Sequence, residues 1–218
     1  MKFFLRIAAF LLLLAIATTA VGYFFWYKPK FTPAKNSFIF TIKPADKTKK
    51  AKLTRLASMA ASVKRYLKIN DYNTTYCFMI DMDIAQGKQR FFIYNMGKDS
   101  IELAGLVTHG SGSGRTSDPY FSNIEGSNCT SLGKYKIGKP YQGKFGLAYK
   151  LYGLDSTNSN AFNRFVVLHA HSCVPDSEVF PLPICKSWGC PTVSPSFLQK
   201  LATYIDNSPQ PVLLWIYK

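Results

Sequence analysis

Histidine and cysteine gather in one short stretch of the chain. His169, His171, Cys173, Cys185 and Cys190 lie within 22 residues of one another. A cysteine acts as a nucleophile in its thiolate form, and a nearby imidazole can pair with that thiolate and lower its pKa from a free value of about 8.5. The stretch therefore predicts acyl chemistry at a thiol, with a histidine as general base.

The sequence Ser187-Trp188-Gly189-Cys190-Pro191 favours Cys190 as the nucleophile. A glycine at position 189 allows a substrate carbonyl to approach the backbone, so the amide N–H of Gly189 or Cys190 could bind the developing oxyanion. His169 follows the apolar residues 165–168, which predict a buried strand, and this position favours His169 as the base.

Other roles for these side chains stay open at this point. His171 and His109 are alternatives for a second base or for the wall of the cleft. A zinc site could use His169, His171 and Cys173 with a further cysteine thiolate, but the paired Cys-x-x-Cys spacing of zinc sites is missing. We therefore predict no metal site and no cofactor.

The five cysteines are an odd number, which indicates at least one free thiol. In an exported protein two disulfides would use four of them, and Cys190 is the expected free one. We expect a bridge between Cys173 and Cys185 that closes a wall of the cleft. Cys77 and Cys129 leave other pairings open.

The charge of the chain is concentrated in its first third. Residues 1–70 hold 14 Lys or Arg and one acid, a net +13, whereas residues 71–218 hold 13 basic and 11 acidic residues, a net +2. A nucleic-acid binder would carry its basic surface on the folded part, so nucleic acid is not a predicted partner. Anionic lipid or an anionic envelope polymer suits this distribution better.

Residues 7–27 form an uncharged, mainly apolar run of 21 residues, which is long enough to span a bilayer. We interpret residues 1–30 as a membrane anchor or a signal segment, and residues 31–72 as a basic stem with an amphipathic helix at 51–68. That helix either packs on the following domain or lies on an anionic surface. Residues 73–218 would be the catalytic domain.

Period-two alternation of apolar residues predicts a strand at 76–84. Turn signals at Gln86-Gly87 and Gly97–Asp99 separate it from further predicted strands at 90–95 and 101–108, and strands are also expected at 165–168 and 212–217. Ser194 and Pro195 predict the start of a helix that continues to Asp206. The fold class is mainly β with a few helices, preceded by a transmembrane or signal helix, and no pattern favours a parallel sheet. Asp81 and Asp83 are interpreted as part of a solvated strand face.

An ordered set of motifs resembles the L,D-transpeptidase catalytic domains of the bacterial cell wall, in the branch whose nucleophile lies in Ser-x-Gly-Cys-Pro. The motifs are Val107-Thr108-His109-Gly110, Phe121-Ser122-Asn123, Ser131-Leu132-Gly133, Leu151-Tyr152-Gly153-Leu154, Val166-Val167-Leu168-His169 and Ser187-Trp188-Gly189-Cys190-Pro191. They extend over about residues 75–217. The chain departs from the family pattern at Trp188, where many members have His, at Pro191-Thr192, where an aliphatic-polar pair is usual, and at His171, where the branch usually has a small residue. The 21 positions from His169 to Cys190 are also more than is common in the wider superfamily.

The resemblance implies a cysteine acyl-enzyme formed from a peptidoglycan stem tetrapeptide, with Cys190 as nucleophile, His169 as base, and Ser187 and Gly189 shaping the nucleophile turn and oxyanion site. The leading reaction would be L,D-transpeptidation, which releases D-Ala and forms a 3-3 cross-link. The alternatives are L,D-carboxypeptidase hydrolysis of the same bond and a non-catalytic wall-binding module. The expected location is the periplasmic side of the bacterial envelope, with an anchor in the inner membrane.

Overall fold

The computed structural model describes residues 6, 14, 16–21, 23, 44–114 and 118–218. The chain divides into two compact units, Met1–Lys47 and Thr48–Lys218. Most of the predicted span at residues 7–27 lies outside the described residues. Among the residues that are described, no helix is both long enough and apolar enough to cross a membrane.

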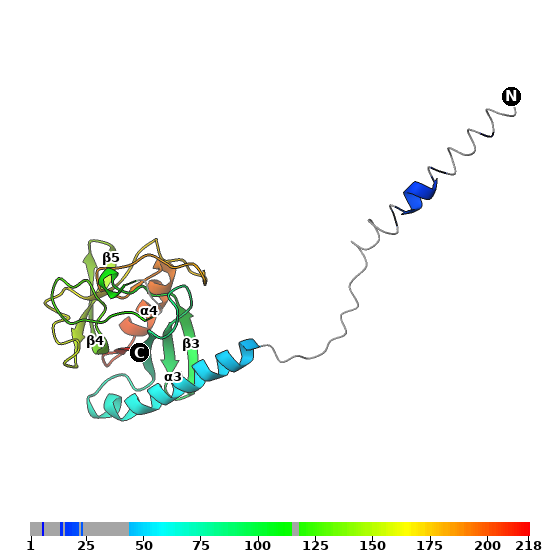
Figure 1. Ribbon diagram of the computed structural model, residues 1–218. Coiled ribbons are helices and arrows are strands. Elements are labelled where there is room, and N and C mark those ends of the chain that lie inside the picture. Colours follow the sequence, from blue (N-terminus) through cyan, green and yellow to red (C-terminus); the bar gives the residue numbers. More distant parts are fainter. Residues whose placement is uncertain (1–5, 7–13, 15, 22, 24–43, 115–117) are drawn as a thin grey trace. The chain divides into compact units, whose positions relative to one another are not determined.

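The second unit is built on one mixed sheet (Figure 1). The strands are β1 (Tyr76–Asp81), β2 (Phe91–Asn95), β3 (Ser100–Gly105), β4 (Gly133–Gly143), β5 (Gly146–Gly153), β6 (Val167–Ala170), β7 (Thr192–Val193) and β8 (Leu213–Tyr217). Their order across the sheet is β3-β2-β1-β8-β4-β5-β6-β7. The helical elements of this unit are α3 (Pro44–Ile69, which begins in the first unit), the short 3-10 turn η2 (Ser111–Ser113) and α4 (Pro195–Asp206).

The β-rich prediction is confirmed, but two strand pairs are parallel. The C-terminal strand β8 lies between β1 and β4 and runs parallel to β1, and β6 runs parallel to β7. Each pair joins segments that are distant in the sequence, so neither a turn motif nor a local hydrophobic period could reveal it. The predicted strand at 76–84 ends at Asp81 because the chain turns there.

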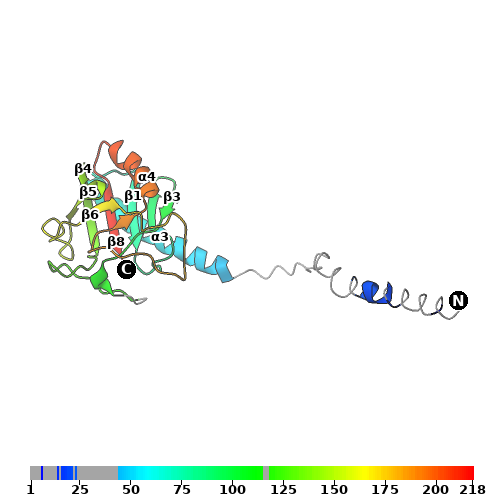
Figure 2. The ribbon, with the colours of Figure 1, turned by 90° about the horizontal axis from the view of Figure 1, so that it is seen from above.

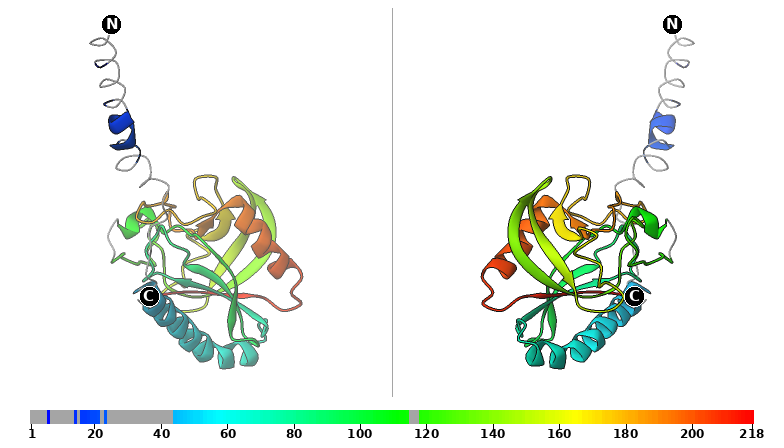
Figure 3. Two further views of the ribbon diagram at one scale, coloured as in Figure 1. Left: turned by 90° about the vertical axis from the view of Figure 1, so that its right-hand side faces the viewer. Right: turned by 90° about the vertical axis from the view of Figure 1, so that its left-hand side faces the viewer.

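Helix α3 covers one face of the sheet (Figure 3). Its buried side chains follow the predicted helical spacing: Leu56, Ala60, Val63 and Leu67 pack with strand residues that include Met79 and Phe92. Leu53, expected on the same face, is 43% exposed. The helix therefore packs on the domain, which is the first of the two arrangements expected from the sequence.

Arg55 ties α3 to the end of β1. Its Nε lies 3.0 Å from Asp81 Oδ2, and its Nη2 lies 2.7 Å from Asp83 Oδ2. Asp81 is only 3% exposed, so the interpretation of a solvated acidic face is wrong for this residue. Burial raises the pKa of Asp81, and its hydrogen bonds and the charge of Arg55 oppose that rise.

Helix α4 covers the opposite face and begins where the sequence predicts. The Ser194 hydroxyl accepts a hydrogen bond from Phe197 N at 3.2 Å, and Pro195 occupies the first turn. Its buried residues pack against the face of the sheet that lies opposite α3, and they are Phe197, Leu198 and Leu201. Because neighbouring residues of a strand point to opposite faces, β1 sends Phe78 toward α4 and Met79 toward α3, and both are fully buried.

Two short strands at the edge of the sheet carry the residues of the candidate site. β6 ends in His169-Ala170, and the neighbouring β7 begins at Thr192, directly after the Ser-Trp-Gly-Cys-Pro motif. In their parallel register His169 lies beside Thr192. Figure 2 shows β6 next to β5 at this side of the domain. The sheet thus brings His169 beside Thr192, the residue that follows the Ser-Trp-Gly-Cys-Pro motif, although the two are 23 positions apart in the sequence.

Candidate active site

A cavity of about 420 Å³ lies at this sheet edge. It brings together most of the residues predicted from sequence. Its lining consists of Thr108, Phe145, His169, His171, Cys173, Cys185, Lys186, Ser187, Trp188, Cys190 and Thr192. Trp188 lies at its mouth and is 80% exposed, whereas His169 is 8% exposed. The cavity is predominantly apolar and contains both a free thiol and an imidazole.

The nucleophile turn requires a glycine at position 189. Gly189 has a φ of +109°, and a Cβ there would lie 2.7 Å from the Cys129 carbonyl oxygen. Gly189 N–H donates to Ser187 Oγ at 3.2 Å, and the Ser187 hydroxyl donates to the Cys190 carbonyl at 2.6 Å. Ser187 therefore closes the turn and occupies the Gly189 N–H. None of the hydrogen bonds between described residues uses the Cys190 N–H, which leaves this amide as the candidate oxyanion donor.

The Cys190 thiol is held by the backbone of the segment leading into β6. Its sulfur accepts a hydrogen bond from Val167 N–H at 3.5 Å, and its S–H donates to the Phe165 carbonyl at 3.7 Å. Burial raises the pKa of the Cys190 thiol, and the Val167 N–H and the Arg164 guanidinium oppose this rise. No hydrogen bond between described residues joins the thiol to His169.

The surroundings of His169 fix its tautomer. Its Nδ1 lies 3.0 Å from the Ala170 carbonyl oxygen, which can only accept, so Nδ1 carries the proton. Its Nε2 is therefore unprotonated and accepts a hydrogen bond from the Thr192 hydroxyl at 2.9 Å. The ring stacks on Phe145 with centroids 5.2 Å apart. Burial lowers the pKa of His169, and a lowered imidazole pKa beside a raised thiol pKa favours a neutral pair. A resting thiolate and imidazolium pair, which is one form that such a site can take, is not favoured here.

His171 lines the same cavity but has a different hydrogen-bond arrangement. Its Nδ1 accepts a hydrogen bond from Cys173 N–H at 3.1 Å. The proton of the neutral ring is therefore on Nε2, which leaves no free lone pair to take a proton from a thiol. The side chain is exposed at the mouth and contacts Phe145 edge to face. Of the two histidines of this cavity, only His169 presents an unprotonated nitrogen to a hydroxyl donor.

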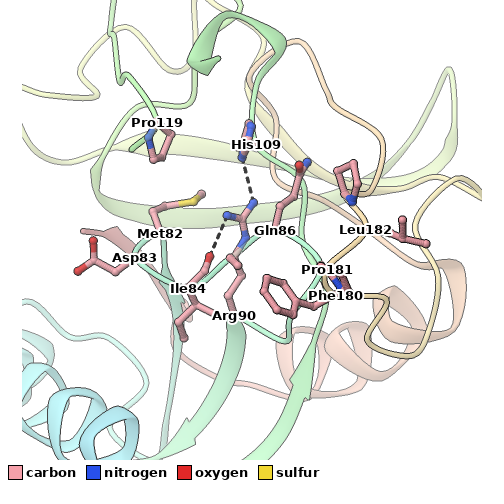
Figure 4. Close-up of a pocket in the computed structure, with 13 residues that line it drawn as sticks. Met82, Asp83, Ile84, Gln86, Arg90, His109, Pro119, Phe180, Pro181 and Leu182 are labelled. Carbon is pink, nitrogen blue, oxygen red and sulfur yellow. Dashed lines mark hydrogen bonds between the residues drawn. The ribbon is translucent and has the colours of Figure 1, made fainter. Parts of the chain in front are cut away.

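The structure places His109 in a separate cavity of about 330 Å³ (Figure 4). Its Nδ1 lies 3.3 Å from Nη2 of the buried Arg90, and its Nε2 lies 3.1 Å from the Gly114 carbonyl oxygen. Burial and the nearby Arg90 charge lower the pKa of His109 to about 4. The neighbouring Thr108 lines the Cys190 cavity, so the expectation that His109 belongs to the catalytic cleft is not met. The reason is that adjacent residues of an extended segment point to opposite sides.

Cys173 and Cys185 form a disulfide in the wall of the Cys190 cavity, which is the pairing expected from the sequence. Cys77 and Cys129 are both buried and free, so the second bridge that an exported protein could have formed is not present. Burial raises the pKa of Cys77 to about 12. Across the described residues there is no group of three or more His, Cys, Asp or Glu side chains placed to hold a metal. The disulfide also removes two thiolates that the zinc alternative could have used.

Sequence reasoning missed several residues of the site. Phe145 comes from the turn between β4 and β5, and Thr192 from the strand after the nucleophile. Arg164 lies behind the nucleophile turn and donates to Cys129 O at 2.6 Å, to Ser131 Oγ at 3.1 Å and to Ser122 O at 3.0 Å. Only the position of Thr192, next to the motif, gave a local signal. The others are brought in by loops and by strand pairing.

Comparison with known proteins assigns the chain to a family. The model of the L,D-transpeptidase catalytic domain matches residues 48–217, which include most of α3 and all eight strands of the sheet. The protein therefore belongs to the L,D-transpeptidase catalytic-domain family, as the motifs predicted. A search of curated proteins found no match.

Solved structures that match the chain include an L,D-transpeptidase and a cell-shape protein. The helical cell shape determining protein Pgp2 of Campylobacter jejuni is 13% identical, with a TM-score of 0.44 over 66% of this chain and 48% of that chain. An L,D-transpeptidase of Mycobacterium smegmatis is 13% identical, with a TM-score of 0.37 over 66% of this chain and 59% of that chain. The chain thus spans about half the length of these structures.

Proposed function

We propose that the protein is a cysteine acyltransferase that acts on peptidoglycan stem tetrapeptides as an L,D-transpeptidase. The observation that supports this most is the pair formed by a free, half-buried Cys190 thiol and an His169 ring whose Nε2 is unprotonated, both lining one cavity. The family supplies the reaction class, and this pair supplies a nucleophile and a base for it. Metal and cofactor play no part in the proposal.

In the proposed first half-reaction, the Cys190 thiol turns toward the cavity and gives its proton to His169 Nε2. The sulfur attacks the carbonyl carbon between the diamino residue and the terminal D-Ala. The C–N bond then breaks, the imidazolium returns the proton to the departing amine, and D-Ala leaves with the acyl group bound to sulfur as a thioester. Because both groups start neutral, proton transfer accompanies attack and no preformed ion pair is required.

The Thr192 hydroxyl suits both protonation states of the base. In the resting state it donates to Nε2, and once Nε2 is protonated the same oxygen can accept from it. The Ala170 carbonyl holds Nδ1–H throughout and so keeps the ring oriented. The Cys190 N–H is our candidate oxyanion donor, because the neighbouring Gly189 N–H is taken by Ser187.

In the proposed second half-reaction, an amine of another stem peptide gives its proton to His169 and attacks the thioester. The thiolate leaves and is protonated again, and the product is a 3-3 cross-link. The walls around Cys190 are formed largely by Phe145, Trp188 and the Cys173–Cys185 disulfide. These apolar groups restrict water near the thioester and favour the amine as acceptor over hydrolysis.

Product masses from purified full-length protein and disaccharide tetrapeptide test the proposal. A cross-linked dimer with released D-Ala supports L,D-transpeptidation, and a disaccharide tripeptide alone would show L,D-carboxypeptidase activity. Unchanged substrate that nevertheless binds would show a wall-binding module without catalysis. The matched control is the Cys190→Ser variant, which should bind substrate and form no product.

We also propose the domain boundaries and location that the sequence suggests: an anchor or signal at residues 1–30, a basic stem and helix at 31–72, and a catalytic domain at 73–218 on the periplasmic side of the inner membrane. The compact unit from Thr48 supports one adjustment, because most of α3 belongs with the catalytic domain. Fractionation of cells that carry the full chain, followed by amino-terminal sequencing, separates a retained anchor from a cleaved signal.

A further inference from the structure

We propose that Lys186 binds a carboxylate of the donor stem peptide and thereby determines substrate preference. This inference rests on the proposed function and names a recognition group for it. Lys186 lies four positions before Cys190 and lines the cavity of the thiol and the imidazole. The ligand class is a carboxylate carried on a peptide, close to the bond that the thiol attacks.

The ammonium of Lys186 has no anionic partner in the described part of the chain. Its Nζ donates to the Gly114 carbonyl oxygen at 2.8 Å, and no ion pair between described residues includes it. Lys186 is the only Lys or Arg among the residues that line the cavity, and no Asp or Glu lines it. An ammonium has three donors, so two remain for a ligand. Lys186 is partly buried, and a partly buried cation attracts an anion more strongly than an exposed one does.

The backbone on both sides of Lys186 is firmly held. The preceding Cys185 is in the disulfide, and its carbonyl accepts a hydrogen bond from Gln86 Nε2 at 3.1 Å. The following Ser187 donates its N–H to His109 O at 3.1 Å and accepts from Ser111 N–H at 2.7 Å. A side chain on such a backbone loses less freedom when it binds a ligand.

The Gly114 carbonyl is held in turn by residues of the neighbouring cavity, where Figure 4 shows the contact between His109 and Arg90. The Gly114 carbonyl that accepts from Lys186 also accepts from His109 Nε2, and His109 is oriented in turn by the buried Arg90. Arg90 is itself bonded to the Val107 carbonyl at 2.9 Å and the Ile84 carbonyl at 3.3 Å. A neutral carbonyl therefore positions the ammonium without neutralising it, which keeps its charge available to a ligand.

A stem tetrapeptide carries two carboxylates near the attacked bond. One is the terminal carboxylate of D-Ala, and the other is the second carboxylate of a dicarboxylic diamino residue. Both have the chemistry that a lysine ammonium recognises as a point charge. The experiment is therefore designed to separate the two sources.

The test compares full-length wild type with Lys186→Met, Lys186→Arg and Lys144→Met. Lys144 is the matched control, because it is an exposed lysine beside Phe145 that does not line the cavity. Three donors are used: the free tetrapeptide, one amidated at the terminal carboxyl, and one amidated at the diamino carboxyl. The rate at which the fourth residue is released gives kcat and KM for each combination of protein and donor peptide.

We expect Lys186→Met to lower kcat/KM for the free tetrapeptide by about 10- to 100-fold, mainly through KM, as for loss of a hydrogen bond to a charged group. Lys186→Arg should recover most of this loss, and Lys144→Met should match wild type. Amidation of the carboxylate that Lys186 binds should abolish the difference between wild type and Lys186→Met, whereas amidation of the other should leave it.

The proposal is overturned if Lys186→Met loses the same factor on all three donors, or loses nothing on the free tetrapeptide. Iodoacetamide labelling of Cys190 keeps a folding defect distinct, because a correctly folded variant should label at the wild-type rate. Failure of the proposed function has a different signature, in which wild type itself releases nothing from any donor. In that case equilibrium binding of the three peptides to wild type and Lys186→Met tests the carboxylate contact directly, and equal affinities would overturn it.

Discussion

The protein has two buried histidines in neighbouring cavities, and their hydrogen-bond partners suit them to different chemistry. His169 has one ring nitrogen bound to a carbonyl and the other facing a hydroxyl, whereas His109 has its nitrogens facing a guanidinium and a carbonyl. Burial lowers the pKa of both rings, so both are neutral near pH 7. The lowered pKa alone therefore does not mark the base.

The difference lies in whether each ring's hydrogen-bond partner can keep its contact when the ring gains a proton. The Thr192 hydroxyl at His169 can both donate and accept, so the ring can gain a proton without losing that contact. The Arg90 guanidinium at His109 can only donate, so a proton on Nδ1 would place two donors face to face beside a buried positive charge. His169 is thus suited to proton transfer, and His109 to holding the loop at Gly114.

The largest effect should come from substitution of the proposed nucleophile, Cys190. Cys190→Ser should form no detectable acyl-enzyme with a tetrapeptide donor, because a serine hydroxyl is far less acidic than a thiol and both groups here start neutral. The substitution is close in size and should leave thermal unfolding nearly unchanged. Intact-mass spectrometry checks for the adduct, and turnover like that of wild type would remove Cys190 from the mechanism.

Exchange of each histidine for glutamine tests the comparison directly. His169→Gln should lower the acylation rate by about 10² to 10⁴-fold, the range for loss of a general acid-base group. His171→Gln should cost much less, because its Nδ1 already accepts a backbone N–H. His109→Gln should leave the rate per folded molecule within a few-fold of wild type. If His109→Gln or His171→Gln were slower than His169→Gln, the base would have to be reassigned.

The pH dependence of stability should distinguish His109 from other groups. Its pKa is about 4 in the folded protein, against 6.5 for an ordinary histidine, so the unfolded chain binds the proton more readily between these values. The associated stability is complete above pH 6.5 and is lost as the pH falls toward 4, up to about 3 kcal/mol. Glutamine offers an acceptor and a donor but does not titrate in this range.

Urea unfolding of wild type and His109→Gln at pH 7 and at pH 4.5 measures this effect. The free-energy difference between the two proteins should shift in favour of His109→Gln at the lower pH. The same free-energy difference between the two proteins at both pH values would mean that His109 does not have a lowered pKa.

Loss of the disulfide should have the smallest effect of this set. The Cys173→Ser/Cys185→Ser double variant should lose about 2 to 3 kcal/mol of stability, as expected for closure of a short loop. The bridge forms part of the wall beside Trp188 and precedes Lys186, so KM should rise more than kcat falls. A Cys77→Ala variant is the control for removal of a thiol outside the site. Equal denaturation midpoints for the double variant and wild type would show that the bridge contributes no stability.

Several features could be read from the sequence because their signals are local. Ser194 and Pro195 define the start of α4, and the spacing of Leu56, Ala60, Val63 and Leu67 defines the buried face of α3. Period-two alternation predicted β1, and the turn signals on either side predicted β2, each within a few residues. The ordered motifs predicted the family and singled out Cys190 and His169.

Only the tertiary structure decided which nitrogens, amides and cysteines are free. His109 and Thr108 are neighbours in the chain but line different cavities, because an extended backbone sends them to opposite sides. The parallel pairs β1–β8 and β6–β7 and the burial of Asp81 beside Arg55 join distant segments, and no local pattern encodes such contacts. Residue types and spacing therefore determined the candidate nucleophile and base. The protonation of His169, the occupied Gly189 amide and the contact of the Lys186 ammonium with a neutral carbonyl depend on hydrogen bonds that exist only once the sheet and its loops have folded.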